Sequence, residues 1–180
     1  MKRFAEGTVI LTAGLILLFA GCSKSNEPRP EPLVNRIYLP DNLVIGAGGQ
    51  LVIPVYFDNE VPISEVSLSL SYTGHHSRCD SVSFIDSRVS GFWMKSQYAD
   101  TVNQKIHVLA VDTSSGVSRG SGVLVNLYFW TFGNAPESDV IIDTVTFFQP
   151  GPLAYADTAL MMLPTPPQFK AGKFHIKSQL

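Results

Sequence analysis

The sequence predicts an all-β domain, an antiparallel β-sandwich of about eight to nine short strands. Short runs of alternating apolar and polar residues recur along the chain, with Gly, Pro and Asn between them, as in strands joined by turns. Ser, Thr, Val and Phe are plentiful while charged residues make up only 16% of the chain, a balance that favours strands over helices. After the first segment no long stretch carries a 3.6-residue period, so we expect no helix in the domain.

The N-terminus has the pattern of a lipoprotein leader. Lys2 and Arg3 precede an apolar run over residues 8–20, which is short for a membrane span and suits a signal-peptide core. The run ends in Leu-Phe-Ala-Gly-Cys at residues 18–22, which resembles the lipobox of bacterial lipoproteins, whose cysteine is lipidated and becomes the first mature residue. We expect a signal peptide over residues 1–21 and lipid, palmitate included, on Cys22. The alternatives are an ordinary secretory leader cut nearby and an uncleaved anchor.

The segment after the leader reads as a tether on the cell envelope. We expect the tether to cover residues 22–33, within which residues 23–32 hold alternating prolines and charges with nothing apolar to bury, as is typical of an extended linker. In lipoproteins of two-membrane bacteria a serine after the cysteine, here Ser23, accompanies outer-membrane sorting. We therefore expect a lipid-anchored protein of the cell envelope, in the outer membrane where the organism has two, with its folded domain over residues 34–178.

The charge and the cysteine content of the chain indicate which partner it does not have and how its domain is stabilised. The net charge is -2 and there is no basic run beyond the N-terminus, so a nucleic-acid partner is not expected. If Cys22 carries lipid, Cys79 is the remaining thiol, and the domain must rest on its core rather than on a disulfide. We expect Cys79 to be a small buried hydrophobe.

The strands follow from the alternation, taken in chain order. The cleanest pattern is residues 63–72, where Val66, Leu68, Leu70 and Tyr72 alternate with Ser67, Ser69 and Ser71, which predicts one buried and one wet, serine-lined face. Because proline has no backbone N–H to donate, Pro54 predicts that the strand at 51–57 lies at a sheet edge or contains a bulge. Residues 105–112 are apolar on both faces and predict a central strand, whereas 73–80 and 90–102 predict loops. The full set of expected strands is 36–39, 51–57, 63–72, 81–89, 105–112, 120–133, 139–148, 159–163 and 172–176.

The domain is organised around the strand at residues 120–133. Alternate residues of a strand point to opposite faces, so Val123, Val125, Leu127 and Phe129 are expected in the core. The other face carries Leu124, Asn126, Tyr128, Trp130 and Phe132. The commoner fate of such an aromatic row is burial, here under the segment 92–94. One alternative is an open row in which Tyr128, Trp130 and Phe132, about 7 Å apart from one to the next, stack on sugar rings. The other is a row that is exposed to solvent and binds nothing.

The order of these strands resembles the cohesin domain and its relatives among the carbohydrate-binding-module sandwiches. Three stretches carry the likeness: the paired strands L-V-I-P-V-Y-F-D-N and I-S-E-V-S-L-S-L-S-Y at 51–59 and 63–72, I-H-V-L-A-V-D-T-S-S-G at 106–116, and G-S-G-V-L-V-N-L-Y-F-W-T-F at 120–132. The resemblance covers the domain from residue 34 to 178 and implies a jelly-roll-like sandwich. It implies binding of a dockerin through one exposed sheet face, or of polysaccharide through surface aromatics, and no binding residue is carried over.

Other candidate sites have weaker patterns. Trp93 and Tyr98, with Phe92, are candidate ligand contacts in the irregular segment, or a plug against the sandwich edge. His75, His76, Cys79 and Asp80 match no metal-ligand spacing, so we expect no metal and no cofactor. Ser118 stands in Gly-Val-Ser-Arg-Gly, but a nucleophile elbow needs a strand-to-helix turn and this motif lies between strands.

We therefore expect a non-catalytic, membrane-tethered binding module that recognises a protein partner or a polysaccharide. The partner surface would be a sheet face such as the serine-lined side of residues 63–72, or the aromatics named above. The alternative is a structural envelope lipoprotein that packs into a larger assembly.

Overall fold

Residues 34–146 and 151–178 are described by the computed structural model, and the expected leader, Cys22 and tether lie outside them. These two ranges form twelve strands and no helix, and accordingly none of their segments is a helix able to span a membrane. The strands are β1 (Arg36–Tyr38), β2 (Leu43–Gly46), β3 (Gln50–Asn59), β4 (Ile63–Tyr72), β5 (Ser77–Ser83), β6 (Met94–Asp100), β7 (Lys105–Val111), β8 (Gly120–Thr131), β9 (Ser138–Thr144), β10 (Leu153–Asp157), β11 (Gln168–Lys170) and β12 (Gly172–Lys177).

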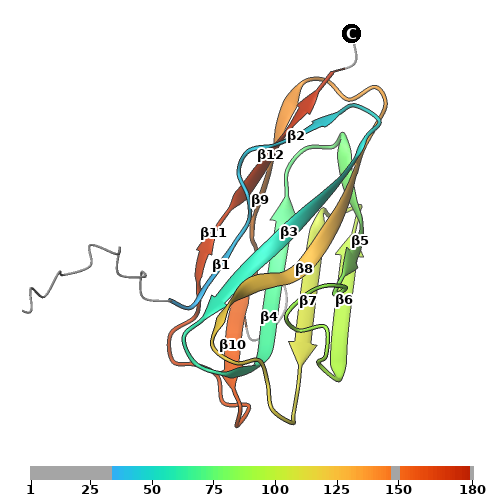
Figure 1. Cartoon of the computed structure of the whole chain (residues 1–180). Helices are drawn as coiled ribbons and strands as arrows, with labels where there is room; N and C mark the ends of the chain where they lie inside the picture. Colours follow the sequence, from blue (N-terminus) through green and yellow to red (C-terminus); the bar gives the residue numbers. More distant parts are fainter. Residues whose placement is uncertain (1–33, 147–150, 179–180) are drawn as a thin grey trace, which may run out of the picture. The chain divides into compact units, whose positions relative to one another are not determined.

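The strands form two sheets that pack face to face (Figure 1). The five-stranded sheet has the order β11-β1-β3-β8-β5, and the seven-stranded sheet has the order β2-β12-β9-β4-β7-β6, with β10 paired to β4. Most pairs are antiparallel, but β1 runs parallel to β11 and β12 runs parallel to β2. The predicted sandwich is thus confirmed, with mixed rather than purely antiparallel sheets.

Phe129 of β8 is the centre of the core. Its ring makes edge contacts with Tyr72 of β4, at 5.1 Å between centroids, and with Phe174 of β12, at 5.3 Å. All three side chains are buried. Since Phe129 belongs to one sheet and its two partners to the other, this cluster ties the layers together, and edge-to-face pairs of this kind add to the stabilisation from burial.

A β-bulge in β8 alters the predicted alternation. Val55 pairs with Val125 and the next residue, Tyr56, pairs with Val123, which leaves Leu124 as the extra residue. Leu124 is fully buried and Val123 only half-buried. The expectation that placed Val123 in the core row and Leu124 in the outer row is therefore wrong at these two positions, because a bulge shifts the alternation by one residue. Val125, Leu127 and Phe129 are buried as predicted.

The serines of β4 differ from the expectation of a wet face. Val66, Leu68, Leu70 and Tyr72 are buried as predicted, but Ser67 and Ser69 are buried as well. Ser67 lies in register between Leu109 and Ala154, and Ser69 lies beside the larger His107. A short side chain in the middle of a broad sheet is shielded by its neighbours even on the outer face.

Several short strands were missed by sequence reasoning. Residues 94–100 form β6 rather than a loop, and residues 77–83 form β5, where the sequence predicted a loop as far as residue 80. The strand expected at 159–163 is a turn with one isolated bridge, from Ala156 to Met162, and the strand lies earlier, at β10. β6 is an edge strand, and the exposure pattern of its residues shows no regular alternation.

Pro54 lies in a central strand rather than at an edge, since β3 stands between β1 and β8. β1 ends at Tyr38, opposite Tyr56, so Pro54 pairs with β8 alone, at Asn126. A proline is tolerated where one side of the strand has no partner, and the bulge of β8 lies directly beyond it.

Truncation of Phe129 tests the position of the core. We expect Phe129→Ala to lower the free energy of unfolding by about 3–5 kcal/mol, because the substitution leaves a cavity between the sheets. Urea denaturation followed by intrinsic fluorescence measures the loss. Ile141→Ala, on an exposed residue of β9, is the control and should change stability by less than about 0.5–1 kcal/mol; equal losses in the two variants would place Phe129 outside the core.

Candidate functional site

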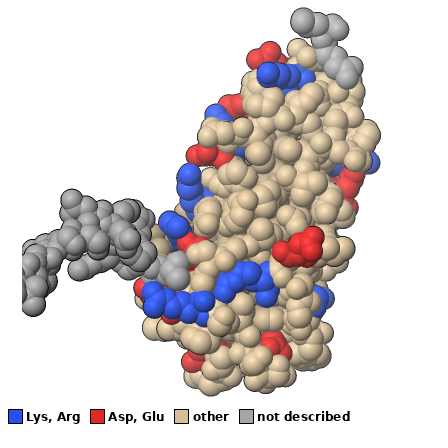
Figure 2. Space-filling model, viewed as in Figure 1, with Lys and Arg blue, Asp and Glu red and all other residues tan. Residues whose placement is uncertain are grey.

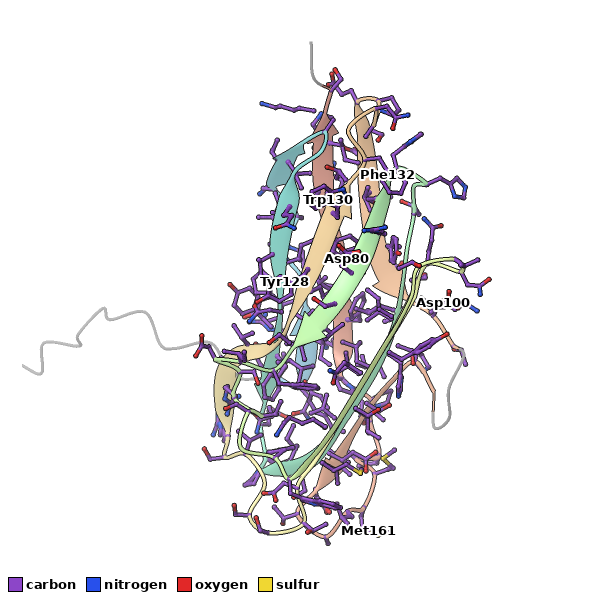
Figure 3. All side chains as sticks on the ribbon, turned by 90° about the vertical axis from the view of Figure 1, so that its right-hand side faces the viewer. Asp80, Asp100, Tyr128, Trp130, Phe132 and Met161 are labelled. Atoms are coloured by element: carbon purple, nitrogen blue, oxygen red, sulfur yellow. The ribbon has the colours of Figure 1, made fainter. Side chains whose placement is uncertain are left out.

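The five aromatic residues singled out from the sequence lie on two different sheets. Tyr128, Trp130 and Phe132 follow one another along β8 and its end, on the outer side of the five-stranded sheet (Figure 3). Trp93 precedes β6 and Tyr98 lies within it, both in or beside the seven-stranded sheet. The structure therefore does not bring all five together, and it defines two separate surfaces.

The row on β8 is open to solvent. Tyr128 is 39% exposed and Phe132 36% exposed, while Trp130 is half-buried. The expected cover does not exist: Phe92 is buried in the core, Trp93 is 64% exposed, and Met94 begins a strand of the other sheet. The expectation that segment 92–94 buries this row is therefore wrong.

The outer surface of the five-stranded sheet, which we call the aromatic face, consists of Tyr38, Val52, Tyr56, Tyr128 and Trp130. Tyr38 and Tyr56 stand opposite each other on β1 and β3 and stack at 5.3 Å, with the Arg36 guanidinium over Tyr38 at 4.9 Å. Val52 pairs with Tyr128 across β3 and β8. Figure 2 shows this side: its central part carries no charge, and charged groups gather at its lower end and along its margins.

A hollow of about 500 Å³ lies on the aromatic face beside Tyr128. Its lining comes from three adjacent strands: Gln50, Leu51 and Val52 of β3, Tyr128 and Phe129 of β8, and Asp80 and Ser81 of β5. Arg78 forms an ion pair of 2.6 Å with Asp80. The volume falls within the range of small-ligand sites.

The outer side of the seven-stranded sheet, which we call the serine face, exposes Ser96, Tyr98, His107 and Leu109 around the buried Ser67 and Ser69. Ser69 Oγ lies 3.0 Å from Nδ1 of His107, and β6 places Ser96 opposite Leu109 and Tyr98 opposite His107. Burial lowers the pKa of His107, so its imidazole is neutral at pH 7. Tyr98 is 49% exposed. The middle of this face is therefore uncharged, and Glu65, Asp100 and Lys105 stand toward its ends.

Within the described residues, the structure does not bring the candidates for metal or nucleophilic chemistry together into one site. Cys79 points into the core opposite Phe129, and burial raises the pKa of its thiol to about 12. Within residues 34–146 and 151–178 no group of three or more His, Cys, Asp or Glu is placed to hold a metal ion. The side chain of Ser118 is exposed, and its backbone carbonyl accepts hydrogen bonds from Asn59 and Arg88.

The carboxyl group of Asp112 has a lowered pKa, which its hydrogen bonds explain. The Ser114 hydroxyl and the backbone N–H groups of Ser114, Ser115 and Gly116 donate hydrogen bonds to it, and they lower its pKa to about 2. Gly116 has a positive φ of 63°, and a Cβ there would overlap the carbonyl oxygen of Ile63. A carboxylate that is already ionised at pH 4 and is saturated with donors fixes a turn and is no general acid.

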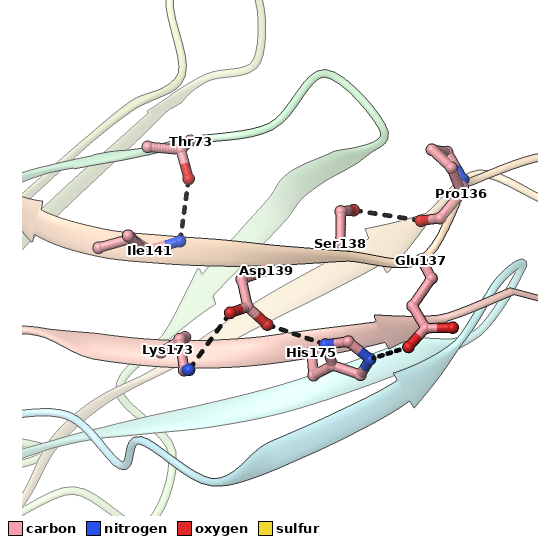
Figure 4. A network of polar contacts seen from close by, with 8 residues as sticks. All are labelled: Thr73, Pro136, Glu137, Ser138, Asp139, Ile141, Lys173 and His175. Carbon is pink, nitrogen blue, oxygen red and sulfur yellow. Dashed lines mark hydrogen bonds and ion pairs between the residues drawn. The ribbon is translucent and has the colours of Figure 1, made fainter.

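His175 joins two carboxylates on the surface of the seven-stranded sheet (Figure 4). Its Nδ1 lies 2.8 Å from Asp139 Oδ1 across the β9–β12 pair, and its Nε2 lies 3.2 Å from Glu137 Oε1. Lys173 pairs with the other oxygen of Asp139 at 3.2 Å. The hydrogen bond with Asp139, followed by that with Glu137, raises the pKa of His175.

Comparison with known proteins identifies the fold. No protein-family model matches the sequence, and no curated protein matches it. Solved cohesin structures are similar in fold. A type I cohesin–dockerin complex from Clostridium thermocellum matches with a TM-score of 0.62 and 19% identity over 81% of this chain and 95% of that chain. The seventh ScaB type I cohesin of Pseudobacteroides cellulosolvens gives 0.64 and 15% identity over 82% and 94%.

The likeness extends to an archaeal protein. A non-cellulosomal cohesin from the archaeon Archaeoglobus fulgidus matches with a TM-score of 0.60 and 16% identity over 79% of this chain and 91% of that chain. The domain is therefore a β-sandwich with a cohesin-like fold, as the strand order predicts. The similarity covers 91–95% of these three cohesin chains.

His175 gives the fold a specific dependence on pH. Its pKa in the folded state lies above the unfolded value, so its contribution to stability is complete below about pH 6.5 and declines as the pH rises through the folded pKa. We expect the difference in urea midpoint between the wild type and His175→Gln to be larger at pH 6 than at pH 9. His76→Gln, at a residue with no part in this network, is the control. A difference that is the same at both pH values would contradict the ion pair with Asp139 and Glu137.

Proposed function

We propose that this chain is a non-catalytic binding module of the bacterial envelope, held by lipid on Cys22, which recognises a protein partner of the dockerin kind. The observation that carries the proposal is the cohesin-like fold over the described domain, because the similar structures include cohesins solved in complex with dockerins.

The serine face is the surface that suits a protein partner best. Its centre is uncharged and combines the apolar Leu109 with the half-exposed ring of Tyr98, and its charges stand toward the ends. Protein interfaces have this arrangement, with aromatic and apolar side chains at the centre and polar groups at the rim. A broad, regular sheet surface also needs little rearrangement on binding.

A charge placed in the middle of the serine face tests the assignment. We expect Ser96→Arg to weaken binding of a dockerin-bearing protein from the same organism by about tenfold or more, because it introduces an unpaired charge beside Leu109. Isothermal titration calorimetry with the mature chain measures the change. The matched control is Ser81→Arg, on an exposed serine of β5 in the other sheet, which should bind as the wild type does.

Two results would overturn this assignment. Binding that survives Ser96→Arg would remove the serine face as the interface. A protein that binds no dockerin and occurs in detergent extracts only as part of a large assembly would favour the alternative of a structural envelope lipoprotein. A freely diffusing monomer in the same extracts would count against that alternative.

The anchor is tested separately. We expect cells fed radiolabelled or alkyne-tagged palmitate to label the wild-type chain, and Cys22→Ser to abolish the label and release the protein from the membrane fraction, because Cys22 is the residue that would carry the lipid. Cys79→Ser is the control and should leave the label unchanged. Labelling that persists in Cys22→Ser would show that the chain is not a lipoprotein of this kind.

A further inference from the structure

A β-bulge in β5 shapes the hollow beside Tyr128. Cys79 pairs with Phe129 and Ser81 pairs with Tyr128, so Asp80 is the extra residue between them. Cys79 is buried while Asp80 and Ser81 are both exposed. An unbroken strand would direct one of two successive side chains inward. The bulge instead directs both polar side chains to the solvent side, where they line the same hollow as Tyr128; Figure 3 shows Asp80 and Tyr128.

The hollow combines an apolar floor with a polar rim. The ring of Tyr128 and the side chain of Val52, 46% exposed, face each other across β8 and β3 and form the floor. Gln50, Asp80 and Ser81 stand around it and offer an amide, a carboxylate and a hydroxyl group. The charge of Asp80 is balanced by Arg78 at 2.6 Å, so the site offers strong hydrogen-bond acceptors and donors without a net charge.

We propose that this hollow is a binding site for a neutral polysaccharide, separate from the protein-binding surface proposed on the other sheet. A sugar ring has an apolar face of C–H groups and an edge of hydroxyl groups. The apolar face would lie on the Tyr128 ring, and the hydroxyl groups would exchange hydrogen bonds with Gln50, Ser81 and the Asp80 carboxylate. Carboxylates and planar amides hold hydroxyl groups with directional bonds, and carboxylates form the stronger ones.

The surroundings of the hollow favour a chain over a single sugar. Trp130 lies two residues along β8 from Tyr128, about 7 Å away, and pairs with Gln50 of the rim. In the other direction the aromatic face continues through Tyr56 to Tyr38. The central part of this face carries no charge (Figure 2), which suits a neutral chain. An acidic or basic ligand would find no compensating cluster there.

Affinity electrophoresis of the mature chain tests the site. The probes are gels that contain hydroxyethyl cellulose, glucomannan, arabinoxylan or amylopectin. We expect at least one of them to retard the wild type, and we expect Tyr128→Ala to weaken that binding about tenfold or more, because the stacking surface is lost. Asp80→Asn should weaken it less, since an amide keeps one acceptor. Tyr128→Phe keeps the ring and should bind as the wild type does.

The variants separate this proposal from the one above. Ser81→Arg should abolish retardation and leave dockerin binding intact, while Ser96→Arg should do the reverse. Retardation by none of the four polysaccharides, or retardation that Tyr128→Ala leaves unchanged while its thermal midpoint equals that of the wild type, would overturn the polysaccharide site. Loss of dockerin binding in Tyr128→Ala would show instead that the aromatic face is a protein interface.

Discussion

The register of β8 is the constraint on which the rest of the domain depends. This strand lies between β3 and β5. Its inward residue Phe129 contacts Tyr72 and Phe174 of the other sheet. A shift of one residue would exchange every inward side chain for an outward one. The same register that seals the core therefore also places Tyr128 and Trp130 on the surface, so that core and candidate site are two consequences of one pairing.

Regular alternation was enough to predict the central strands, and it failed where the backbone departs from regularity. β4, β7 and β12 lie where the sequence placed them, and β4 has the predicted bounds. The strands β2, β6, β10 and β11 were missed, because β2, β10 and β11 have only three to five residues and the exposure of β6, an edge strand, does not alternate. The parallel pairs were missed because pairing partners leave no local pattern. The bulges at Leu124 and Asp80 were missed because they depend on the neighbouring strand.

For the candidate sites too, the period of a strand predicts which side chains point outward but not which segments cover them. The outward row of Tyr128 and Trp130 was predictable from the period of a strand, but whether another segment covers it depends on distant packing, and Trp93 turned out to lie elsewhere. The sequence offers Asp80 as a candidate metal ligand or catalytic acid and not as a neighbour of Tyr128, because that place depends on the bulge in β5. The alternation of β4 predicts Ser67 and Ser69 in water, but their neighbours bury them, and Leu109, His107 and Tyr98 form the outer surface.

Thiol labelling along β8 tests the register most directly. Single cysteines are placed in turn at residues 123 to 128 of a chain with Cys22→Ser and Cys79→Ala, and the rate of modification by a small maleimide is measured in the native state. The structure predicts slow labelling at 124, 125 and 127 and fast labelling at 126 and 128, with two adjacent protected residues at the bulge. An unbroken alternation through 124 and 125, or fast labelling at 127 with protection at 128, would contradict this register and the aromatic face derived from it.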